Sequence, residues 1–189
     1  MRVIAGSLSR REIKSPKGYQ THPMSEKVRG ALFNTLGDVA GLSVLDAYGG
    51  SGALSFEALS RGASFAQLID KDFAAIQIII DNIEKLGLGD SAKVTKANSA
   101  AWSENNLDKK FDLVLCDPPF DRLNLETISK LTRHLNPNGL MVLSFTGRES
   151  VPPVNGVVVV DSRIYGDAAL AFYRFRSDAT NNPPVVQQS

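Results

Sequence analysis

The segment from Asp117 to Phe120 reads Asp-Pro-Pro-Phe and combines three chemical properties in four residues. Its two prolines fix their own φ angles and restrict the residue before each, so the backbone carbonyls of the loop point in set directions. Because proline has no N–H, the loop is also rich in hydrogen-bond acceptors. A carboxylate and a proline carbonyl can accept both hydrogens of an amino group while the Phe120 ring stacks on a flat base.

Holding an exocyclic amine in this way prepares it for methylation. When both hydrogens are held, the nitrogen lone pair turns out of conjugation and toward a methyl donor, as an in-line displacement requires. Asp117 can also accept the proton that is released after transfer. We therefore predict that Asp117, Pro118, Pro119 and Phe120 form the catalytic segment. Taken in isolation, the same four residues could equally be a rigid turn that ends a strand.

A second group of residues at 44–52 has the sequence Val-Leu-Asp-Ala-Tyr-Gly-Gly-Ser-Gly, where a strand pattern gives way to a helical one. Glycines at such a turn let the backbone approach a ligand closely, and a helix N-terminus favours negative or polar groups. Asp70 ends the next predicted strand, where a carboxylate can bind ribose hydroxyls. The third glycine of a dinucleotide fingerprint is absent. Asp46, ahead of the glycines, suits the amino group and sulfonium of S-adenosylmethionine better than a pyrophosphate.

The apolar pattern predicts the elements that position these residues. Strands are expected at 43–47, 65–69, 92–97, 111–116 and 140–145, and helices at 52–61, 73–86, 99–106 and 123–135. Alternating strands and helices imply a parallel sheet covered on both faces. The runs at 157–160 and 168–175 suit a closing antiparallel hairpin. We predict an α/β fold with a Rossmann-like, seven-stranded, mostly parallel sheet.

In such a sheet the ligand crevice lies at the carboxyl ends of the strands. The glycine turn follows the first predicted strand and Asp-Pro-Pro-Phe follows the fourth, so both are expected at the same edge. This shared position favours the catalytic interpretation of Asp-Pro-Pro-Phe over the structural one.

The N-terminal part carries a local excess of positive charge. Residues 1–30 hold seven Lys/Arg against two Glu, whereas residues 31–189 carry a net charge of −4. We expect a small β-hairpin or extended arm over residues 1–24, with turns at Gly6 and Gly18. Ser25 can then cap a helix through about Leu36. A basic arm suggests contact with a polyanion, although a solvated surface hairpin would explain the charge equally well.

Composition limits the remaining possibilities. The 189 residues suit one domain, which we place at 25–176, with a disordered tail at 177–189. The single cysteine, Cys116, excludes an internal disulfide, and with only His22 and His134 beside it we expect no metal site. No apolar run approaches the length of about 20 residues that spans a bilayer, and the N-terminus lacks a signal-peptide pattern. We expect a cytoplasmic monomer.

Several segments resemble the RsmD family in sequence and in order. They are 2–7 (Arg-Val-Ile-Ala-Gly-Ser), 15–18 (Ser-Pro-Lys-Gly), 25–34 (Ser-Glu-Lys-Val-Arg-Gly-Ala-Leu-Phe-Asn), 50–54 (Gly-Ser-Gly-Ala-Leu), 57–63 (Glu-Ala-Leu-Ser-Arg-Gly-Ala) and 117–120. The resemblance covers roughly residues 1–176. Members of this family are bacterial 16S ribosomal RNA guanine-N2 methyltransferases that use S-adenosylmethionine on a Rossmann-like sheet.

The resemblance implies roles for the matching positions. The methionine end of the cofactor would be held by Asp46, Gly50, Ser51 and Gly52, and the ribose by Asp70. Asn98 and Ser99, after the third strand, would flank the adenine. Asp117, Pro118 and Phe120 would form the guanine site. The residues expected to meet ribosomal RNA are Arg10, Arg11, Lys14, Lys17, His22 and Arg29. His22 stands where the family usually has arginine, which weakens one of these contacts.

Two rival functions remain open from the residues. A DNA adenine-N6 methyltransferase could use the same acceptor loop, but the chain shows no separate DNA-reading domain. A non-catalytic RNA-binding assembly factor could keep the fold, but the acidic and glycine residues of both groups are intact.

Overall fold

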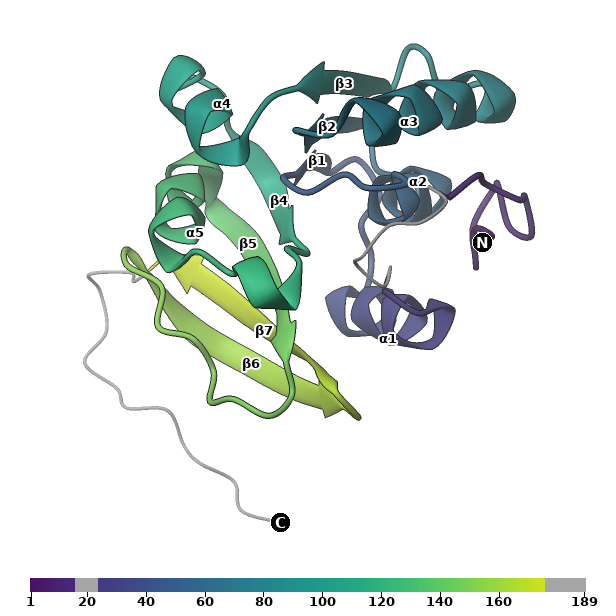
Figure 1. Cartoon of the computed structure of the whole chain (residues 1–189). Coiled ribbons are helices and arrows are strands. Elements are labelled where there is room, and N and C mark those ends of the chain that lie inside the picture. Colours follow the sequence, from purple (N-terminus) through teal and green to yellow (C-terminus); the bar gives the residue numbers. More distant parts are fainter. Residues whose placement is uncertain (16–23, 176–189) are drawn as a thin grey trace.

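The computed structural model describes residues 1–15 and 24–175. In this part of the chain, seven strands form one sheet in the order β3-β2-β1-β4-β5-β7-β6 (Figure 1). The strands are β1 (Ser43–Asp46), β2 (Phe65–Asp70), β3 (Ala92–Lys96), β4 (Phe111–Cys116), β5 (Leu135–Thr146), β6 (Val157–Tyr165) and β7 (Ala168–Phe175). The predicted seven-stranded α/β fold is confirmed.

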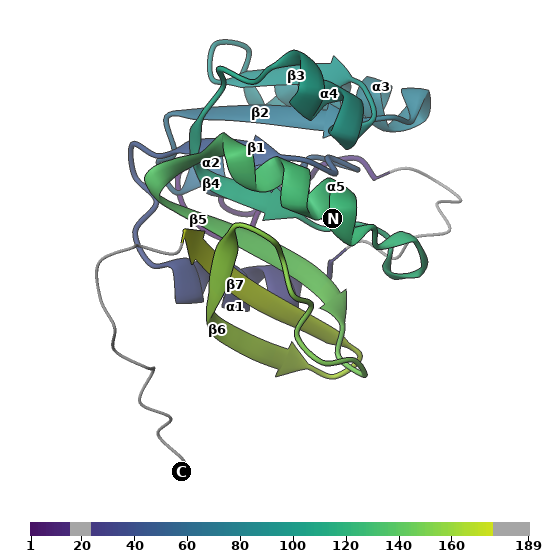
Figure 2. The ribbon, with the colours of Figure 1, turned by 90° about the vertical axis from the view of Figure 1, so that its left-hand side faces the viewer.

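The direction of the strands changes at one side of the sheet. β1 to β5 are parallel to one another, whereas β7 is antiparallel to both β5 and β6. Only Gly166 and Asp167 separate β6 from β7, and so short a connection allows only a hairpin. The strand order reverses at β1 and β4, which makes the loops after these two strands the topological switch point (Figure 2).

Helices cover both faces of the sheet. α1 (Glu26–Leu36), α2 (Ala53–Ser60) and α3 (Phe73–Leu86) lie on one face, and α4 (Ser99–Asn105) and α5 (Leu125–Leu131) on the other (Figure 1). Successive strand residues point to opposite faces, so Val44 belongs to the core under α1–α3 and Leu45 to the core under α4 and α5. Burial on both sides explains why the central strands are almost continuously apolar. No described helix is both long enough and apolar enough to cross a membrane.

Three predicted elements have the wrong bounds. The helix expected at 123–135 contains α5, which is capped by the Asn124 side chain, and the 3-10 turn Thr132–His134 (η2); another 3-10 turn, Phe120–Arg122 (η1), precedes it. The strand expected at 140–145 is β5, which begins at Leu135. Leu135 already belongs to β5, because it pairs with Phe111 of β4 and is buried. The strand expected at 157–160 extends to Tyr165, because β6 pairs along β7.

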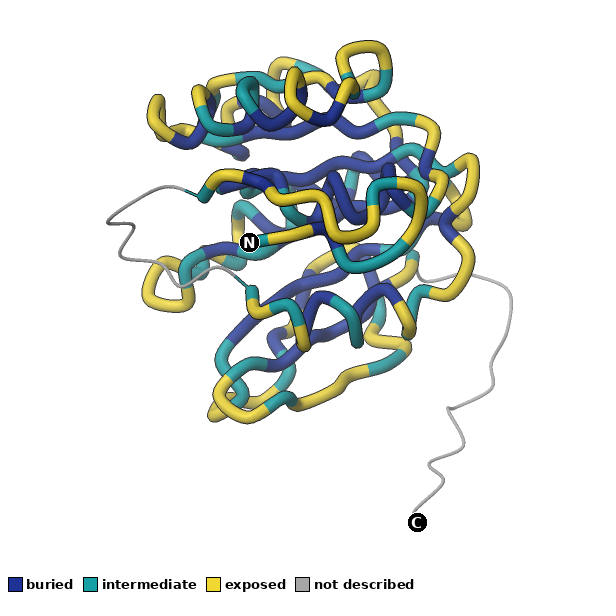
Figure 3. The backbone as a smooth tube through the Cα atoms, turned by 90° about the vertical axis from the view of Figure 1, so that its right-hand side faces the viewer, coloured by how far each residue is buried: buried dark blue, intermediate teal, exposed yellow. Residues whose placement is uncertain are grey.

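The expected N-terminal hairpin is present and packs on α2. Arg2 and Glu12 form an antiparallel bridge, and Gly6 makes the turn with φ +81°. The backbone N–H of Ser7 donates to the carbonyl of Ser60 at 2.8 Å. Figure 3 shows this arm (residues 1–15) as a partly exposed segment that crosses buried parts of the domain. The predicted turn at Gly18 and the predicted disordered tail lie outside the described residues.

Candidate active site

The glycine turn and the Asp-Pro-Pro-Phe loop follow two strands that are direct neighbours. Asp46, the last residue of β1, is paired with Leu115 of β4, and the N–H of Ala47 donates to the carbonyl of Leu115 at 3.0 Å. β1 and β4 therefore end at the same edge, one residue apart in register. The sequence prediction that both segments share one sheet edge is confirmed.

Asp46 is a buried carboxylate with one unused oxygen. Its side chain is 1% exposed, and one oxygen accepts a hydrogen bond from the hydroxyl of Ser55 at 2.9 Å. The other oxygen has no partner among the described residues. Burial is the main reason that the pKa of Asp46 is raised to about 7; the Ser55 hydrogen bond lowers it, and the charge of Asp117 raises it. A buried acceptor without a donor is costly, so Asp46 fits a ligand that brings a donor or a positive charge.

The glycines of the turn serve two different purposes. Gly50 has φ +55°, and a Cβ there would meet nothing closer than the carbonyl oxygen of Tyr48 at 3.9 Å. The turn is thus open at Gly50, as close approach of a ligand requires. At Gly52, with φ +82°, a Cβ would lie 2.3 Å from the ring of Phe56. Gly52 is therefore required by the packing of α2, whatever the ligand.

Asp70 is fixed against the glycine turn. One carboxylate oxygen accepts the N–H of Gly50 at 2.8 Å, and the other accepts the N–H of Asp72 at 2.9 Å. Each carboxylate oxygen has two lone pairs, so Asp70 keeps acceptor capacity for the two hydroxyls of a ribose while its orientation is set by the backbone.

Asn98 and Ser99 have structural partners at the start of α4. The side-chain oxygen of Asn98 accepts the N–H of Ala100 at 2.9 Å, and the buried hydroxyl of Ser99 donates to the carbonyl of Ala47 at 2.6 Å. The second bond joins the N-terminus of α4 to the end of β1. Both residues thus lie beside the glycine turn, and their contact with an adenine remains a prediction.

The Asp-Pro-Pro-Phe loop presents both a carboxylate and an aromatic ring at the edge. Asp117 is half-buried; burial raises its pKa to about 6, against a hydrogen bond with Ser144 that lowers it. Pro118 is buried, Pro119 is half-buried, and Phe120 begins η1 with 45% of its surface exposed. An exposed ring next to a carboxylate is the arrangement that a stacked, hydrogen-bonded base requires.

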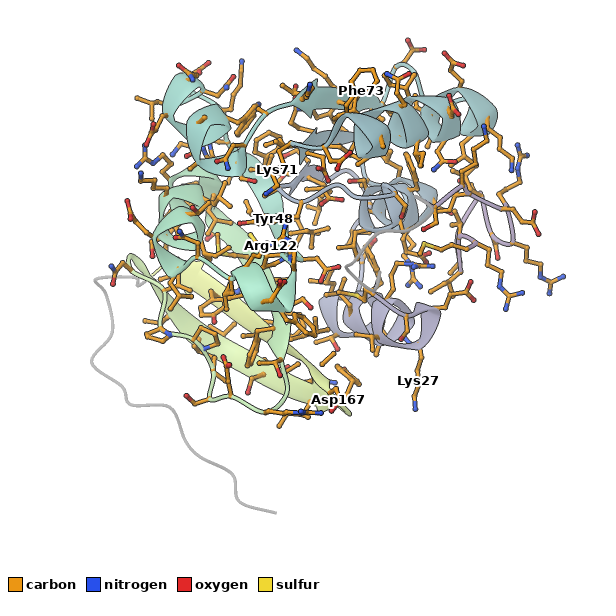
Figure 4. The ribbon with its side chains drawn as sticks, in the orientation of Figure 1. Lys27, Tyr48, Lys71, Phe73, Arg122 and Asp167 are labelled. Carbon is orange, nitrogen blue, oxygen red and sulfur yellow. The ribbon has the colours of Figure 1, made fainter. Side chains whose placement is uncertain are left out.

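Sequence reasoning missed two polar residues at this edge. Ser144 of β5 follows Leu143, the partner of Cys116, so only the strand register shows that it faces Asp117. Tyr48 follows β1 and is half-buried; burial raises its pKa above its usual value, against a hydrogen bond with Ser99. Figure 4 shows Tyr48 in the middle of the molecule, between Lys71 and Arg122.

The predicted RNA contact of Arg29 is wrong for this structure. Arg29 is 1% exposed, its Nη2 donates to the carbonyl of Arg2 at 2.6 Å, and its Nε lies 3.8 Å from the fully buried carboxylate of Glu57. Glu57 also accepts the N–H groups of Ile4 and Ala5 at 2.7 and 3.1 Å. The buried carboxylate requires a cation nearby, and two arginines supply it: Arg29 from α1, and Arg61, whose Nε donates to Glu57 at 2.8 Å.

Other cations of the arm also have partners within the protein. Lys14 forms an ion pair with Asp81 at 2.7 Å, and Arg11 donates to the carbonyl of Lys85 at 3.1 Å. Arg10 is exposed, has φ +66°, and lines a shallow hollow of about 540 Å³ together with Arg2, Val3, Ile4 and Glu26. The remaining predicted RNA contacts, Lys17 and His22, lie outside the described residues.

Cysteine and metal chemistry have no basis in the described residues. Cys116 is buried, and burial raises the pKa of its thiol, so it is not an activated nucleophile. Residues 1–15 and 24–175 contain no group of three His, Cys, Asp or Glu side chains that could hold a metal ion.

The fold and the site define a class of protein. A seven-stranded sheet whose only antiparallel strand is β7, with a glycine turn after β1 and an acidic residue at the end of β2, is the fold of class I S-adenosylmethionine-dependent methyltransferases. Within this class, residues 1–174 match the family described as "Conserved hypothetical protein 95". The chain belongs to this family, which is the RsmD family, so the predicted family membership is confirmed.

Individual relatives support this assignment. The chain is 32% identical over 183 residues to "Putative rRNA methyltransferase YlbH" of Bacillus subtilis, covering 93% of this chain and 100% of that protein. It is 38% identical over 133 residues to "Ribosomal RNA small subunit methyltransferase D" of Escherichia coli, covering 69% and 66%. Among solved structures, "Putative methyltransferase yhhF" from Escherichia coli superposes with a TM-score of 0.80 at 32% identity, covering 93% and 97%.

Proposed function

We propose that this protein transfers a methyl group from S-adenosylmethionine to the exocyclic N2 amine of a guanine in 16S ribosomal RNA of the small subunit. One observation carries the proposal: Asp46, with its unused buried oxygen, and the acceptor loop at Asp117 end neighbouring strands at one sheet edge. The names of the relatives support ribosomal RNA as the substrate. The choice of guanine N2 rests on the family resemblance.

The residues around the glycine turn fit the proposed cofactor. S-adenosylmethionine supplies an electrophilic methyl group when it is bound. The open backbone at Gly50 would allow close approach, and the unused oxygen of Asp46 would accept a donor from the cofactor's ammonium group. Asp70, already aligned by Gly50, would accept the ribose hydroxyls. Burial and the charges of Asp117 and Asp70 raise the pKa of Asp46, so a cationic ligand is favoured, because its positive charge relieves the repulsion between these carboxylates.

The acceptor loop would act on the base. With a pKa of about 6, Asp117 is ionised at neutral pH and can accept a hydrogen bond from the amine. The Pro118 carbonyl is the natural second acceptor, because neither Pro118 nor Pro119 has an N–H that could compete with the amine for acceptors. The Phe120 ring would stack on the base and hold its plane. As the N–C bond forms, the sulfonium–methyl bond would break and S-adenosylhomocysteine would leave. The amine becomes cationic and loses a proton, which Asp117 can accept.

The experiment that tests this function compares substrates directly. The protein is incubated with methyl-labelled cofactor and with 30S subunits that lack the modification, naked 16S ribosomal RNA or duplex DNA, and each digest is analysed by mass spectrometry. We expect N2-methylguanosine in the ribosomal RNA, and none with the Asp117→Ala variant. N6-methyladenine in the DNA would overturn the proposal in favour of a DNA methyltransferase. Cofactor binding without transfer to any substrate would indicate a non-catalytic assembly factor.

A further inference from the structure

Two cations at the carboxyl edge of the sheet have partners: Lys96 at the end of β3 lies 5.3 Å from the centroid of the Phe73 ring, and Arg148 after β5 pairs with Asp167 at 3.0 Å. Three others, outside the arm, have no partner on another element among the described residues. Lys71 directly follows β2, Arg122 ends η1 after β4, and Lys27 lies in the first turn of α1. All three side chains are exposed. Within the described residues, Lys27 and Lys71 make no ion pair or hydrogen bond. Arg122 has only its chain neighbour Asp121, at 3.6 Å, with both side chains more than half exposed. These charges are available to a ligand, unlike those of Lys14 and Arg29.

The strand order places Lys71 and Arg122 on opposite sides of the glycine turn. β1 lies between β2 and β4, so the loop after β1 is bracketed by the loops that carry these two residues. Figure 4 shows Lys71 above Tyr48 and Arg122 below it, with Lys27 further down on α1. Arg122 is also only two residues beyond the exposed ring of Phe120. Lys71 and Arg122 therefore flank the glycine turn beside the position of the proposed target base, and Lys27 extends the positive charge further along the molecule.

The acidity of the site itself makes such cations necessary for a polyanionic substrate. Asp46, Asp70 and Asp117 end or follow three adjacent strands. A phosphate backbone that approached them would meet like charges, and this repulsion acts over a screening length of about 8 Å at physiological salt. Cations at the rim offset it and attract phosphates without regard to base sequence.

We propose that Lys27, Lys71 and Arg122 form a cation rim that binds the backbone phosphates on either side of the target nucleotide. This inference rests on the proposed function, because it requires a nucleic-acid substrate. The rim holds the strand over the site, and the Asp-Pro-Pro-Phe loop holds the base. Phosphate contacts fix the register of the nucleic acid, whereas the loop selects the amine.

The test uses charge reversal on the rim and on the opposite edge. The rim variants are Lys27→Glu, Lys71→Glu and Arg122→Glu, with the neutral variants Lys71→Gln and Arg122→Gln. Lys93 is the matched control, because it is exposed and lies at the amino end of β3. Lys110, exposed just before β4 but with its Nζ donating to the carbonyl of Arg133, is a second control for 30S binding only. Binding to 30S subunits that lack the modification is measured between about 50 and 200 mM salt, together with binding of S-adenosylhomocysteine and thermal stability.

We expect each rim reversal to weaken 30S binding about fivefold or more and to reduce the slope of log affinity against log salt by about one. Cofactor-product binding and the melting temperature should stay unchanged, as should 30S binding by Lys93→Glu and Lys110→Glu. Rim variants that bind 30S subunits like the controls would overturn the rim while leaving the methylation of ribosomal RNA intact. If Lys71→Glu weakens only the binding of S-adenosylhomocysteine and leaves 30S binding intact, Lys71 does not bind phosphate. If the unmodified protein neither binds nor methylates RNA, the proposed function and the rim both fail.

Discussion

Asp70 accepts a hydrogen bond from the backbone N–H of Gly50 at 2.8 Å, which joins the end of β2 to the turn after β1. The same carboxylate that would bind a ribose therefore also shapes the glycine turn. Removing it should damage the cofactor site in two ways, through the lost acceptor and through the released turn.

We expect Asp70→Ala to weaken S-adenosylhomocysteine binding by at least tenfold, because a hydrogen bond to a charged group contributes about 1.5–3 kcal/mol. Calorimetric titration measures this affinity. Asp90→Asn, which replaces an exposed carboxylate far from the turn, is the control. An Asp70→Ala variant that binds as tightly as the control would exclude Asp70 from the cofactor site.

We expect Asp117 to act on the base and to have no role in binding the cofactor. Asp117→Ala should lower kcat about a hundredfold or more while the affinity for S-adenosylhomocysteine changes less than twofold. Because burial raises the pKa of Asp117 to about 6, the kcat of the unmodified protein should also fall as the pH is lowered through 6. A flat pH profile between pH 5 and 8, or a fully active Asp117→Ala variant, would contradict this role.

The buried carboxyl group of Asp46 should lower the free energy of unfolding at neutral pH. Its folded-state pKa of about 7 lies above the usual value of 3.8, so between these values the folded chain holds a proton that the unfolded chain has lost. The free energy of unfolding should therefore fall as the pH rises from about 4 to about 7. Asp46→Asn, which cannot ionise, should be more stable than the unmodified protein at pH 8 by on the order of 1–3 kcal/mol, and should bind the cofactor product more weakly. Urea unfolding at pH 5 and pH 8 measures how the free energy of unfolding of each protein changes with pH. An equal change for the two proteins would refute the raised pKa of Asp46.

Asn82 links the arm to the cofactor turn. It is fully buried, its Nδ2 donates to the carbonyls of Lys14 and Ser51 at 3.0 Å each, and its Oδ1 accepts the N–H of Lys14 at 2.8 Å. Asn82→Ala leaves these backbone groups without partners, so we expect a loss of about 2–4 kcal/mol in stability and weaker binding of S-adenosylhomocysteine.

Lys14→Ala is the matched control for Asn82, because it keeps the backbone bonds and removes only the exposed ion pair with Asp81. We expect this change to lower the free energy of unfolding by less than about 1 kcal/mol. If Asn82→Ala loses stability while its affinity for the cofactor product stays intact, Asn82 supports the arm alone and has no role in positioning Ser51.

Gly6 and Gly37 differ in why glycine is needed: at Gly6 a side chain would clash, whereas at Gly37 only the backbone conformation favours glycine. Both have positive φ, but a Cβ on Gly6 would lie 1.8 Å from the carbonyl oxygen of Ser60, whereas one on Gly37 would meet nothing within 4 Å. Gly37→Ala should cost about 1–3 kcal/mol, because φ +74° with ψ −135° is a backbone conformation nearly restricted to glycine. Gly6→Ala should lower the stability more and should expose the arm to proteolysis. Thermal melting measures the first effect and limited trypsin digestion the second. Equal effects would mean that the arm can shift away from α2 at little cost.

Much of the fold follows from local patterns, because alternating apolar strands and helices leave few arrangements of a parallel sheet. The shared edge of the glycine turn and the Asp-Pro-Pro-Phe loop follows from the same pattern. The role of Arg29 does not. A basic residue beside Val28 on a short helix looks like part of a surface, and its burial depends on Glu57, a residue far along the chain.

Strand register accounts for most of what sequence reasoning missed. Ser144 meets Asp117 only because Leu143 is aligned with Cys116. Likewise, the Asn-Pro-Asn-Gly segment after Leu135 reads as a turn, yet it lies within β5 because Leu135 pairs with Phe111 across a register shift. Such pairings depend on partners distant in sequence and on the packing of both faces.

The docking of the arm on Glu57 has a consequence for how the chain folds during synthesis. Ile4 leaves the ribosome early, but the carboxylate that accepts its N–H is 53 residues further along the chain. The first strand of the hairpin must therefore wait, with its basic side chains exposed, until α2 has been translated. The N-terminus is translated first. Because such long-range contacts form slowly, it is nevertheless one of the last parts to reach its native position. A truncation that removes it would leave Glu57 paired with Arg29 and Arg61 but without the backbone donors of Ile4 and Ala5, inside an otherwise complete domain.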